Sequence, residues 1–87
     1  MKTVFLVYHT DNWQSWSSHR VVGIGTTFNN AIKLAKQDKD AISDVKNNNG
    51  HVVIYEYQPN KIDSDKSIFC TSNDDDYKKL IGKEKED

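Results

Sequence analysis

Cysteine, proline and arginine are almost absent from this sequence of 87 residues, which contains one of each, the cysteine being Cys70 and the arginine Arg20. A single cysteine excludes an internal disulfide, and this fits a reducing compartment. Long apolar runs are missing too, because the run Val4–Val7 is too short for a secretory signal or a membrane span. We therefore expect a cytoplasmic protein that does not enter a membrane.

A strong charge of either sign is also lacking, since 12 basic and 13 acidic residues give a net charge of −1. This balance excludes nucleic-acid binding by bulk charge and mimicry of DNA by a polyanion. Lysine nevertheless outnumbers arginine 11 to 1, and there are eight asparagines. Such usage follows A/T-rich codons and suggests a low-GC bacterium or its phage.

Large apolar residues are few, because Leu, Ile, Val and Phe together make up 20 of the 87 residues. That share, about 23%, is just above the level below which chains are usually disordered. A chain of this length forms one domain, and its core must be thin. We assign residues 1–82 to a single domain and residues 83–87 to a charged tail.

The clearest pattern is a strand, Arg20–Gly25, that turns into an amphipathic helix. Apolar residues recur at helical spacing between Phe28 and Val45, and an Asn-rich stretch ending in glycine stops the helix. Thr26 or Thr27 can supply the N-cap oxygen. Gln37–Asp40 contains no apolar residue, so both one kinked helix and two short helices fit the pattern. We favour one helix.

Further strands and a short helix flank this unit. Thr3–Thr10 is apolar on both faces and forms an antiparallel hairpin with Arg20–Gly25 through a polar loop. The order ββαβ, followed by a weaker strand and a short helix, predicts a small α+β two-layer sandwich. We expect an antiparallel sheet of three to four strands covered by one main helix. The later elements are the strands His51–Gln58 and Ser67–Thr71 and the helix Asp75–Ile81.

Part of the sequence resembles a pattern in small uncharacterised bacterial and phage domains. It consists of the strand with its polar loop, then "VVGIGTT", then the helix "NNAIKLAK". In these domains a strand of the type hydrophobic-Gly-hydrophobic runs into Ser or Thr and an Ala-containing helix. The resemblance covers Thr3 to Tyr57, although Gly25 stands where such domains often carry Phe or Tyr. It implies a fold and no activity.

Gly23 and Gly25 have two interpretations. They are typical of a bulge, or of a close approach between strand and helix. Alternatively, Gly25, Thr26 and Thr27 could form a phosphate-binding turn at the helix N-terminus and, with Lys33, bind a nucleotide or nucleic acid. A dinucleotide fingerprint would need a third glycine, which is missing, and aspartates offset the helix lysines. We favour packing.

Enzymatic and metal chemistry find little support in the sequence. His9, Asp11 and His19 could meet at the base of the hairpin and hold zinc, but they also fit strand ends beside an exposed loop. Nucleophile motifs and paired carboxylates suited to a cleft are missing. We expect a protein that is not an enzyme and that holds no metal or cofactor.

The strongest candidate for function is the loop with Trp13 and Trp16, because exposed tryptophans dominate protein interfaces. We predict a small protein-binding module in which these two residues contact the partner and Asp11, His19 and Arg20 form the rim. A phage or mobile-element accessory protein that inhibits a host factor would suit the size and codon usage. Two alternatives stay open: the tryptophans cover the core, or an edge strand or this loop forms a homodimer.

Overall fold

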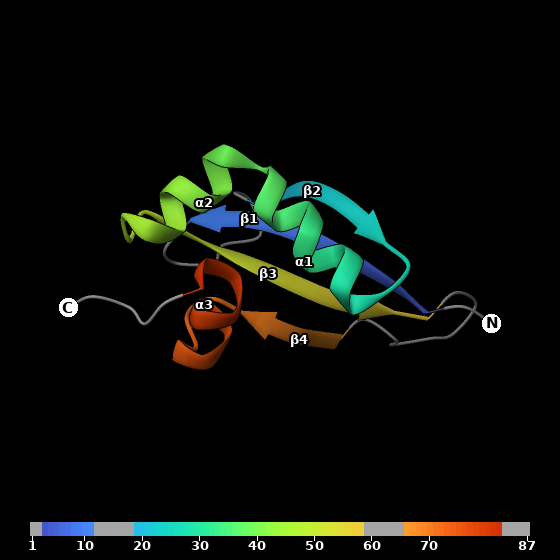
Figure 1. The fold of residues 1–87 in the computed structure, drawn as a ribbon. Helices are drawn as coiled ribbons and strands as arrows, with labels where there is room; N and C mark the ends of the chain where they lie inside the picture. Colours follow the sequence, from blue (N-terminus) through green and yellow to red (C-terminus); the bar gives the residue numbers. More distant parts are fainter. Residues whose placement is uncertain (1–2, 12–18, 59–65, 83–87) are drawn as a thin grey trace.

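The computed structural model describes residues 3–11, 19–58 and 66–82 of the chain. Within them, four strands form one antiparallel sheet in the order β2-β1-β3-β4. Helices α1 and α2 cross one face of the sheet, and α3 lies beside them near β4 (Figure 1). This confirms the predicted small α+β two-layer sandwich. The elements are β1 Val4–Asp11, β2 Arg20–Gly25, α1 Phe28–Gln37, α2 Lys39–Lys46, β3 Gly50–Tyr57, β4 Lys66–Cys70 and α3 Asp74–Ile81.

The two faces of the sheet differ because strand side chains alternate between them. Val7 of β1 pairs with Ile54 of β3, and both are fully buried in the core under the helices. The next pair, Tyr8 and Val53, therefore points to the opposite side. We call that side the helix-free face, since the described helices pack on the other one. Its described members include Val4, Leu6, Tyr8, Val21, Ile24, Val53, Tyr55 and Tyr57.

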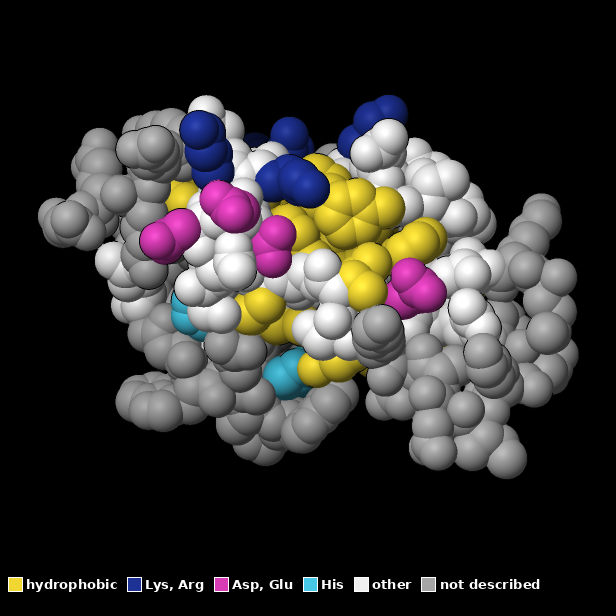
Figure 2. Space-filling model, turned by 90° about the horizontal axis from the view of Figure 1, so that it is seen from below, with side chains coloured by type: hydrophobic (Ala, Val, Ile, Leu, Met, Phe, Trp, Pro, Cys, Tyr) yellow, Lys and Arg dark blue, Asp and Glu magenta, His cyan; other side chains and the backbone are white. Residues whose placement is uncertain are grey.

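The core fills the space between the sheet and the three helices. Phe28, at the start of α1, extends it by edge-on contacts with Phe69 at 5.9 Å and Phe5 at 6.3 Å between ring centroids. The Lys79 ammonium lies 5.2 Å from the centre of the Phe28 ring, a cation–π contact that partly covers this aromatic. Seen from below Figure 1, hydrophobic side chains gather in the middle of the surface, with basic side chains above them and acidic ones to either side (Figure 2). The buried members are Val7, Ala31, Ile32, Ala35, Ala41, Val45, Val52, Ile54, Phe69, Tyr77 and Leu80.

The helical region between β2 and β3 consists of two helices, which corrects the expectation of one continuous helix. α1 ends at Gln37 and α2 begins at Lys39. Asp38 between them is extended, with φ −86° and ψ 100°, and its backbone N–H donates to the carbonyl of Ala35. Its side chain accepts a hydrogen bond of 3.0 Å from the N–H of Ala41. One residue thus closes α1 and caps α2.

Gly23 and Gly25 let α1 approach β2 closely, as the packing interpretation predicts. A Cβ on Gly25 would lie 2.8 Å from the backbone nitrogen of Ala31, and one on Gly23 would lie 3.1 Å from a methyl of Leu34. The pairing of β1 with β2 also shifts register beside Gly23, so a bulge accompanies the close approach. Packing alone therefore accounts for both glycines.

The predicted edge strand and C-terminal helix are confirmed as β4 and α3. The side chain of Asn73 accepts from the backbone N–H groups of Asp75 and Asp76 at the start of α3, and Gly82 closes the helix with φ 91°. Acidic residues occupy the first turn, where the helix dipole favours them. None of the helices in the described ranges has the length and apolar character needed to cross a membrane.

Candidate functional site

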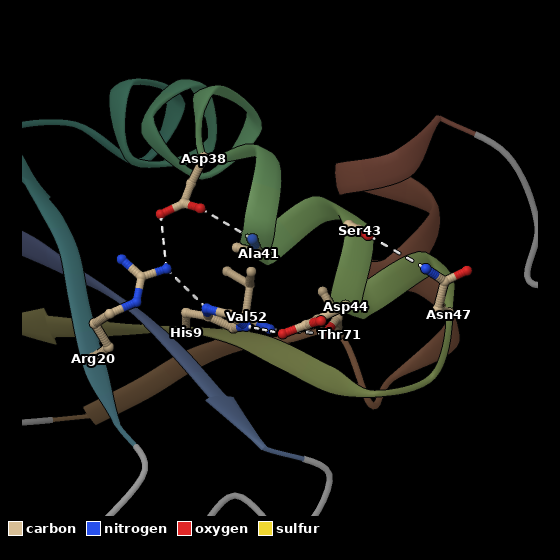
Figure 3. Close-up of polar contacts among 9 residues, drawn as sticks. All are labelled: His9, Arg20, Asp38, Ala41, Ser43, Asp44, Asn47, Val52 and Thr71. Atoms are coloured by element: carbon tan, nitrogen blue, oxygen red, sulfur yellow. Dashed lines mark hydrogen bonds and ion pairs between the residues drawn. The ribbon is translucent and has the colours of Figure 1, made fainter.

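A chain of polar and charged side chains lies at the end of the sheet where β1 ends and β2 begins (Figure 3). Nε2 of His9 lies 2.7 Å from Oδ2 of Asp44. Nη2 of Arg20 lies 2.9 Å from Nδ1 of His9 and 3.0 Å from Oδ2 of Asp38. We call these four residues the His9 cluster. They connect β1, β2, the junction of α1 with α2, and α2 itself.

The backbone places these side chains. His9 and Arg20 are directly paired on β1 and β2, so both side chains point to the helix side of the sheet. Gly50 lets α2 approach β1 closely because it has no side chain. A Cβ there would lie 2.6 Å from the carbonyl oxygen of Thr10 and 3.2 Å from Cβ of Asp44. A larger residue at this position would move Asp44 away from His9.

The hydrogen bonds define the protonation of His9. A guanidinium can only donate, so Nδ1 of His9 must accept the hydrogen bond from Arg20. The proton of the neutral ring then lies on Nε2, which donates to the carboxylate of Asp44. The cluster therefore contains a neutral imidazole in one tautomer, held between a cation and an anion.

The carboxyl group of Asp38 is stabilised in its charged form. Its pKa lies below the ordinary value of 3.8, chiefly because the backbone N–H of Ala41 donates to it. Partial burial opposes this effect, whereas the hydrogen bond and the charge of Arg20 reinforce it. Asp38 is thus an ionised carboxylate at neutral pH, and it orients the guanidinium of Arg20.

An open pocket of about 270 Å³ lies beside the cluster. Two of the predicted rim residues, Asp11 and Arg20, belong to it. Its wall combines carboxylates, a guanidinium, an imidazole and neutral polar groups, which suits water or a small polar group better than an apolar ligand. The lining residues are His9, Thr10, Asp11, Arg20, Asp44 and Asn49.

His9 is not free to act as a general base toward a substrate in the pocket. Both ring nitrogens of His9 are engaged, Nε2 with Asp44 and Nδ1 with Arg20, so neither points to a substrate. Across the described residues, no group of three or more His, Cys, Asp or Glu side chains could hold a metal ion. The zinc site considered from His9, Asp11 and His19 is not assembled, because His19 lies on the opposite face.

His19 belongs to an aromatic cluster on the helix-free face. Its ring centroid lies 5.3 Å from that of Tyr8 and 6.4 Å from that of Tyr55. Tyr8 and Tyr55 contact each other edge to face at 5.5 Å. The predicted rim is therefore divided, with Asp11 and Arg20 beside the pocket and His19 among tyrosines on the other side of the sheet.

Three large hydrophobic side chains of the described residues are exposed, namely Ile24 at 60%, Val21 at 54% and Tyr57 at 40% of their surface. Their strand partners are Leu6, Tyr8 and Val4, which places all three on the helix-free face. We call them the exposed apolar set. Sequence reasoning missed Val21 and Ile24, because the bulge in β2 interrupts the alternation that would have assigned them a face.

Trp13 and Trp16, the central residues of the predicted interface, lie outside the described residues. The chain leaves β1 at Asp11 and returns at His19, so this segment starts and ends at the same end of the sheet as the His9 cluster. Whether the tryptophans contact a partner, cover the core or form a homodimer thus stays a prediction.

The alternative ligand site at the start of α1 is used in part by the fold itself. The hydroxyl of Thr27 accepts from the N–H of Asn30 at 3.1 Å, and its carbonyl accepts from Ala31 at 3.0 Å. Gly25 is buried, whereas Thr26 and Lys33 are exposed. One of the free first-turn amides that a phosphate would use, that of Asn30, is therefore occupied.

Comparison of the chain with models of protein families, with curated proteins and with solved structures found no match. The resemblance to small bacterial and phage domains accordingly stays a prediction.

Proposed function

We propose that this protein is a small non-enzymatic domain that binds another protein through the helix-free face of its sheet. The observation that carries the proposal is the exposed apolar set. Every large hydrophobic side chain exposed within the described residues lies on this one face. Scattered exposed apolar residues are ordinary, but exposure confined to one face is typical of an interaction surface.

Shape and chemistry support a protein as the partner. Ile24 on β2 and Tyr57 on β3 lie on either side of β1. Their strand partners on β1, Leu6 and Val4, are partly buried, so the apolar surface extends across three strands. Tyr8 and Tyr55 continue it toward the hairpin end as an edge-to-face aromatic pair. Tyrosine is enriched at interface hot spots because its ring is large and its hydroxyl can pair.

The same face argues against the alternative of a nucleic acid. Its described members include no lysine or arginine, whereas stacking of bases on aromatic residues is normally combined with basic side chains that contact the phosphates. Arg20 points to the other side and is held by Asp38. The preferred partner is therefore a protein that presents an apolar surface of its own.

The remaining parts of the proposal are carried by the sequence. Trp13 and Trp16 would enlarge the contact at the hairpin end. A cytoplasmic location agrees with the single cysteine, and the role of a phage or mobile-element inhibitor agrees with size and codon usage.

The test begins with capture of the partner by the tagged protein from a lysate of the encoding organism, followed by its identification and purification. The dissociation constant of the purified pair is then measured for wild type, Ile24→Glu and Tyr57→Glu. We expect each variant to weaken binding at least about 30-fold, the loss typical of an interface hot spot. Asn29→Glu on the exposed side of α1 introduces the same charge and should leave affinity within about threefold.

Two outcomes would contradict the proposal. In the first, the face variants bind as wild type does, although their melting temperatures show that they are folded. In the second, sedimentation finds a dimer that Ile24→Glu converts to a monomer, so that the face is occupied by a second copy of the chain.

A further inference from the structure

The two edge strands of the sheet, β2 and β4, differ in how their outer backbone groups are satisfied. An edge strand directs N–H and C=O groups outward, and these can pair with a further strand. At β4 the N–H of Cys70 donates to the carboxylate of Asp76 at 3.1 Å, and α3 lies beside the strand (Figure 1). At β2, within the part of the chain that the structure describes, the backbone forms hydrogen bonds with β1 alone. The edge of β2 is therefore open there.

Backbone pairing at the centre of the sheet shows which groups of β2 point outward. The N–H of Val52 on β3 donates to the hydroxyl of Thr71 at 3.0 Å, and the N–H of Thr71 donates to the carbonyl of Val52 at 3.1 Å. Thr71 directly follows β4, so both backbone groups of Val52 point away from β1. Opposite residues of an antiparallel pair point either toward each other or away from each other. The backbone groups of His9, which lies opposite Val52, therefore point to β2.

Alternation along β1 then assigns the outward groups of β2. Tyr8 and Leu6 direct their backbone groups to β3, because neighbouring residues of a strand alternate and the pairing of β1 with β3 is regular. Their partners on β2 are Val21 and Ile24, whose N–H and C=O groups accordingly point to the open edge. Both residues belong to the exposed apolar set. The open edge thus combines unpaired backbone groups with exposed apolar side chains at the same two residues.

We propose that an extended strand of the partner protein pairs with the outer edge of β2 and continues the sheet. This inference rests on the proposed function and describes how the partner is bound. The backbone groups of Val21 and Ile24 form hydrogen bonds with the added strand, and apolar side chains on one side of that strand contact the side chains of the same two residues. In strand addition the main-chain bonds give affinity and alternate side chains give specificity.

Charge does not protect this edge. Natural edge strands are often guarded by lysine or proline, and β2 contains neither. Its one charged residue, Arg20, points to the helix side of the sheet, where His9 and Asp38 hold its guanidinium. The bulge increases the twist of β2 but leaves the backbone groups of Val21 and Ile24 directed outward.

The flank of α1 above the edge favours a partner strand over a second copy of the chain. Leu34 of α1 lies over Gly23 of β2 and is half-buried. Asn30 and Gln37 lie one turn to either side of Leu34 and are exposed. Two copies joined through β2 would bring two such polar flanks together, whereas a single added strand covers only the edge of the sheet.

Amide hydrogen exchange tests the inference without any substitution. In the free protein the amides of Val21 and Ile24 should exchange rapidly, because they point to the open edge. Addition of the purified partner from the capture experiment should slow their exchange at least about tenfold. The amide of Cys70, on the other edge, should exchange at an unchanged rate, since it is already bonded to Asp76.

A proline at position 24 tests the backbone contact separately from the side chain. Ile24→Pro removes the outward N–H, and proline is accepted in edge strands where its nitrogen faces solvent. Ile24→Ala is the matched control, because it shortens the side chain and keeps the N–H. We expect Ile24→Pro to bind the partner about tenfold more weakly than Ile24→Ala, since one hydrogen bond is lost and the proline ring obstructs the added strand.

The outcomes separate this inference from the proposed function. Strand addition is overturned if Tyr57→Glu weakens binding while the amides of Val21 and Ile24 are not slowed and Ile24→Pro binds as Ile24→Ala does. The helix-free face then remains the binding site through its side chains. If Tyr57→Glu and Ile24→Glu also bind as wild type does, both proposals fail. Slow exchange at Val21 and Ile24 in the free protein that becomes rapid on dilution would also overturn strand addition by a partner, because a second copy then occupies the edge.

Discussion

Replacement of Asp38 by alanine should destabilise the domain, because this residue both caps α2 and holds Arg20. Loss of an N-cap costs about 0.5–2 kcal/mol, and an exposed ion pair contributes roughly 0.2–1 kcal/mol. We expect Asp38→Ala to lower the free energy of unfolding by about 0.7–3 kcal/mol. For a domain of this length, each kcal/mol lowers the melting temperature by about 4–8 °C.

Asparagine at the same position separates the two contributions, since its side chain caps a helix as well as aspartate does but carries no charge. Asp38→Asn should therefore lose only about 0.2–1 kcal/mol. The neighbouring exposed Asp40 is the control for removal of an acidic residue from the first turn of α2, and Asp40→Ala should cost about 0.3–1 kcal/mol. Urea denaturation followed by circular dichroism measures all three variants. An Asp38→Asn loss equal to that of Asp38→Ala would refute the capping argument.

Three further predictions concern the acid limit, the core and the close approach of α1 to β2. The pKa of Asp38 is lowered in the folded state, so its charge stabilises the fold above pH 3.8. Urea titrations should therefore show that the stability difference between wild type and Asp38→Asn vanishes as the pH falls below that value. Calorimetry should show that Ile54→Ala, at a fully buried position, costs about 2–5 kcal/mol. Ile24→Ala should change stability by less than about 0.5 kcal/mol, and an equal loss for the two variants would contradict the assignment of faces. Gly25→Ala should cost about 1–3 kcal/mol in thermal melts, because its Cβ would clash with the backbone of Ala31, and an unchanged stability would refute this packing.

The order of the elements along the chain and the two layers could be predicted because they rest on local patterns. The apolar run of β1, the alternation in β3 and the polar boundaries of α3 each occupy a short stretch of sequence. The division of the main helix was harder, since apolar residues continue at helical spacing on both sides of Asp38. Its capping role depends on an extended backbone conformation that the packing of two helices selects.

The candidate site depends on contacts between distant residues. His9 and Asp44 are 35 positions apart, and no spacing rule connects a strand residue with a helix residue across that distance. The helix-free face was hidden for another reason, since the bulge in β2 interrupts the alternation between Val21 and Ile24. The sequence identified apolar residues in this strand but not the side of the sheet to which they point.

Methyl NMR of the complex with the captured partner tests the proposed contact surface most directly. On addition of the unlabelled partner, the methyl signals of Val21 and Ile24 should broaden or shift, whereas those of Ile32 and Ile54 in the core should change least. Perturbations centred on the outer side of α1 and α2, with the signals of Val21 and Ile24 unchanged, would contradict the helix-free face as the site of binding.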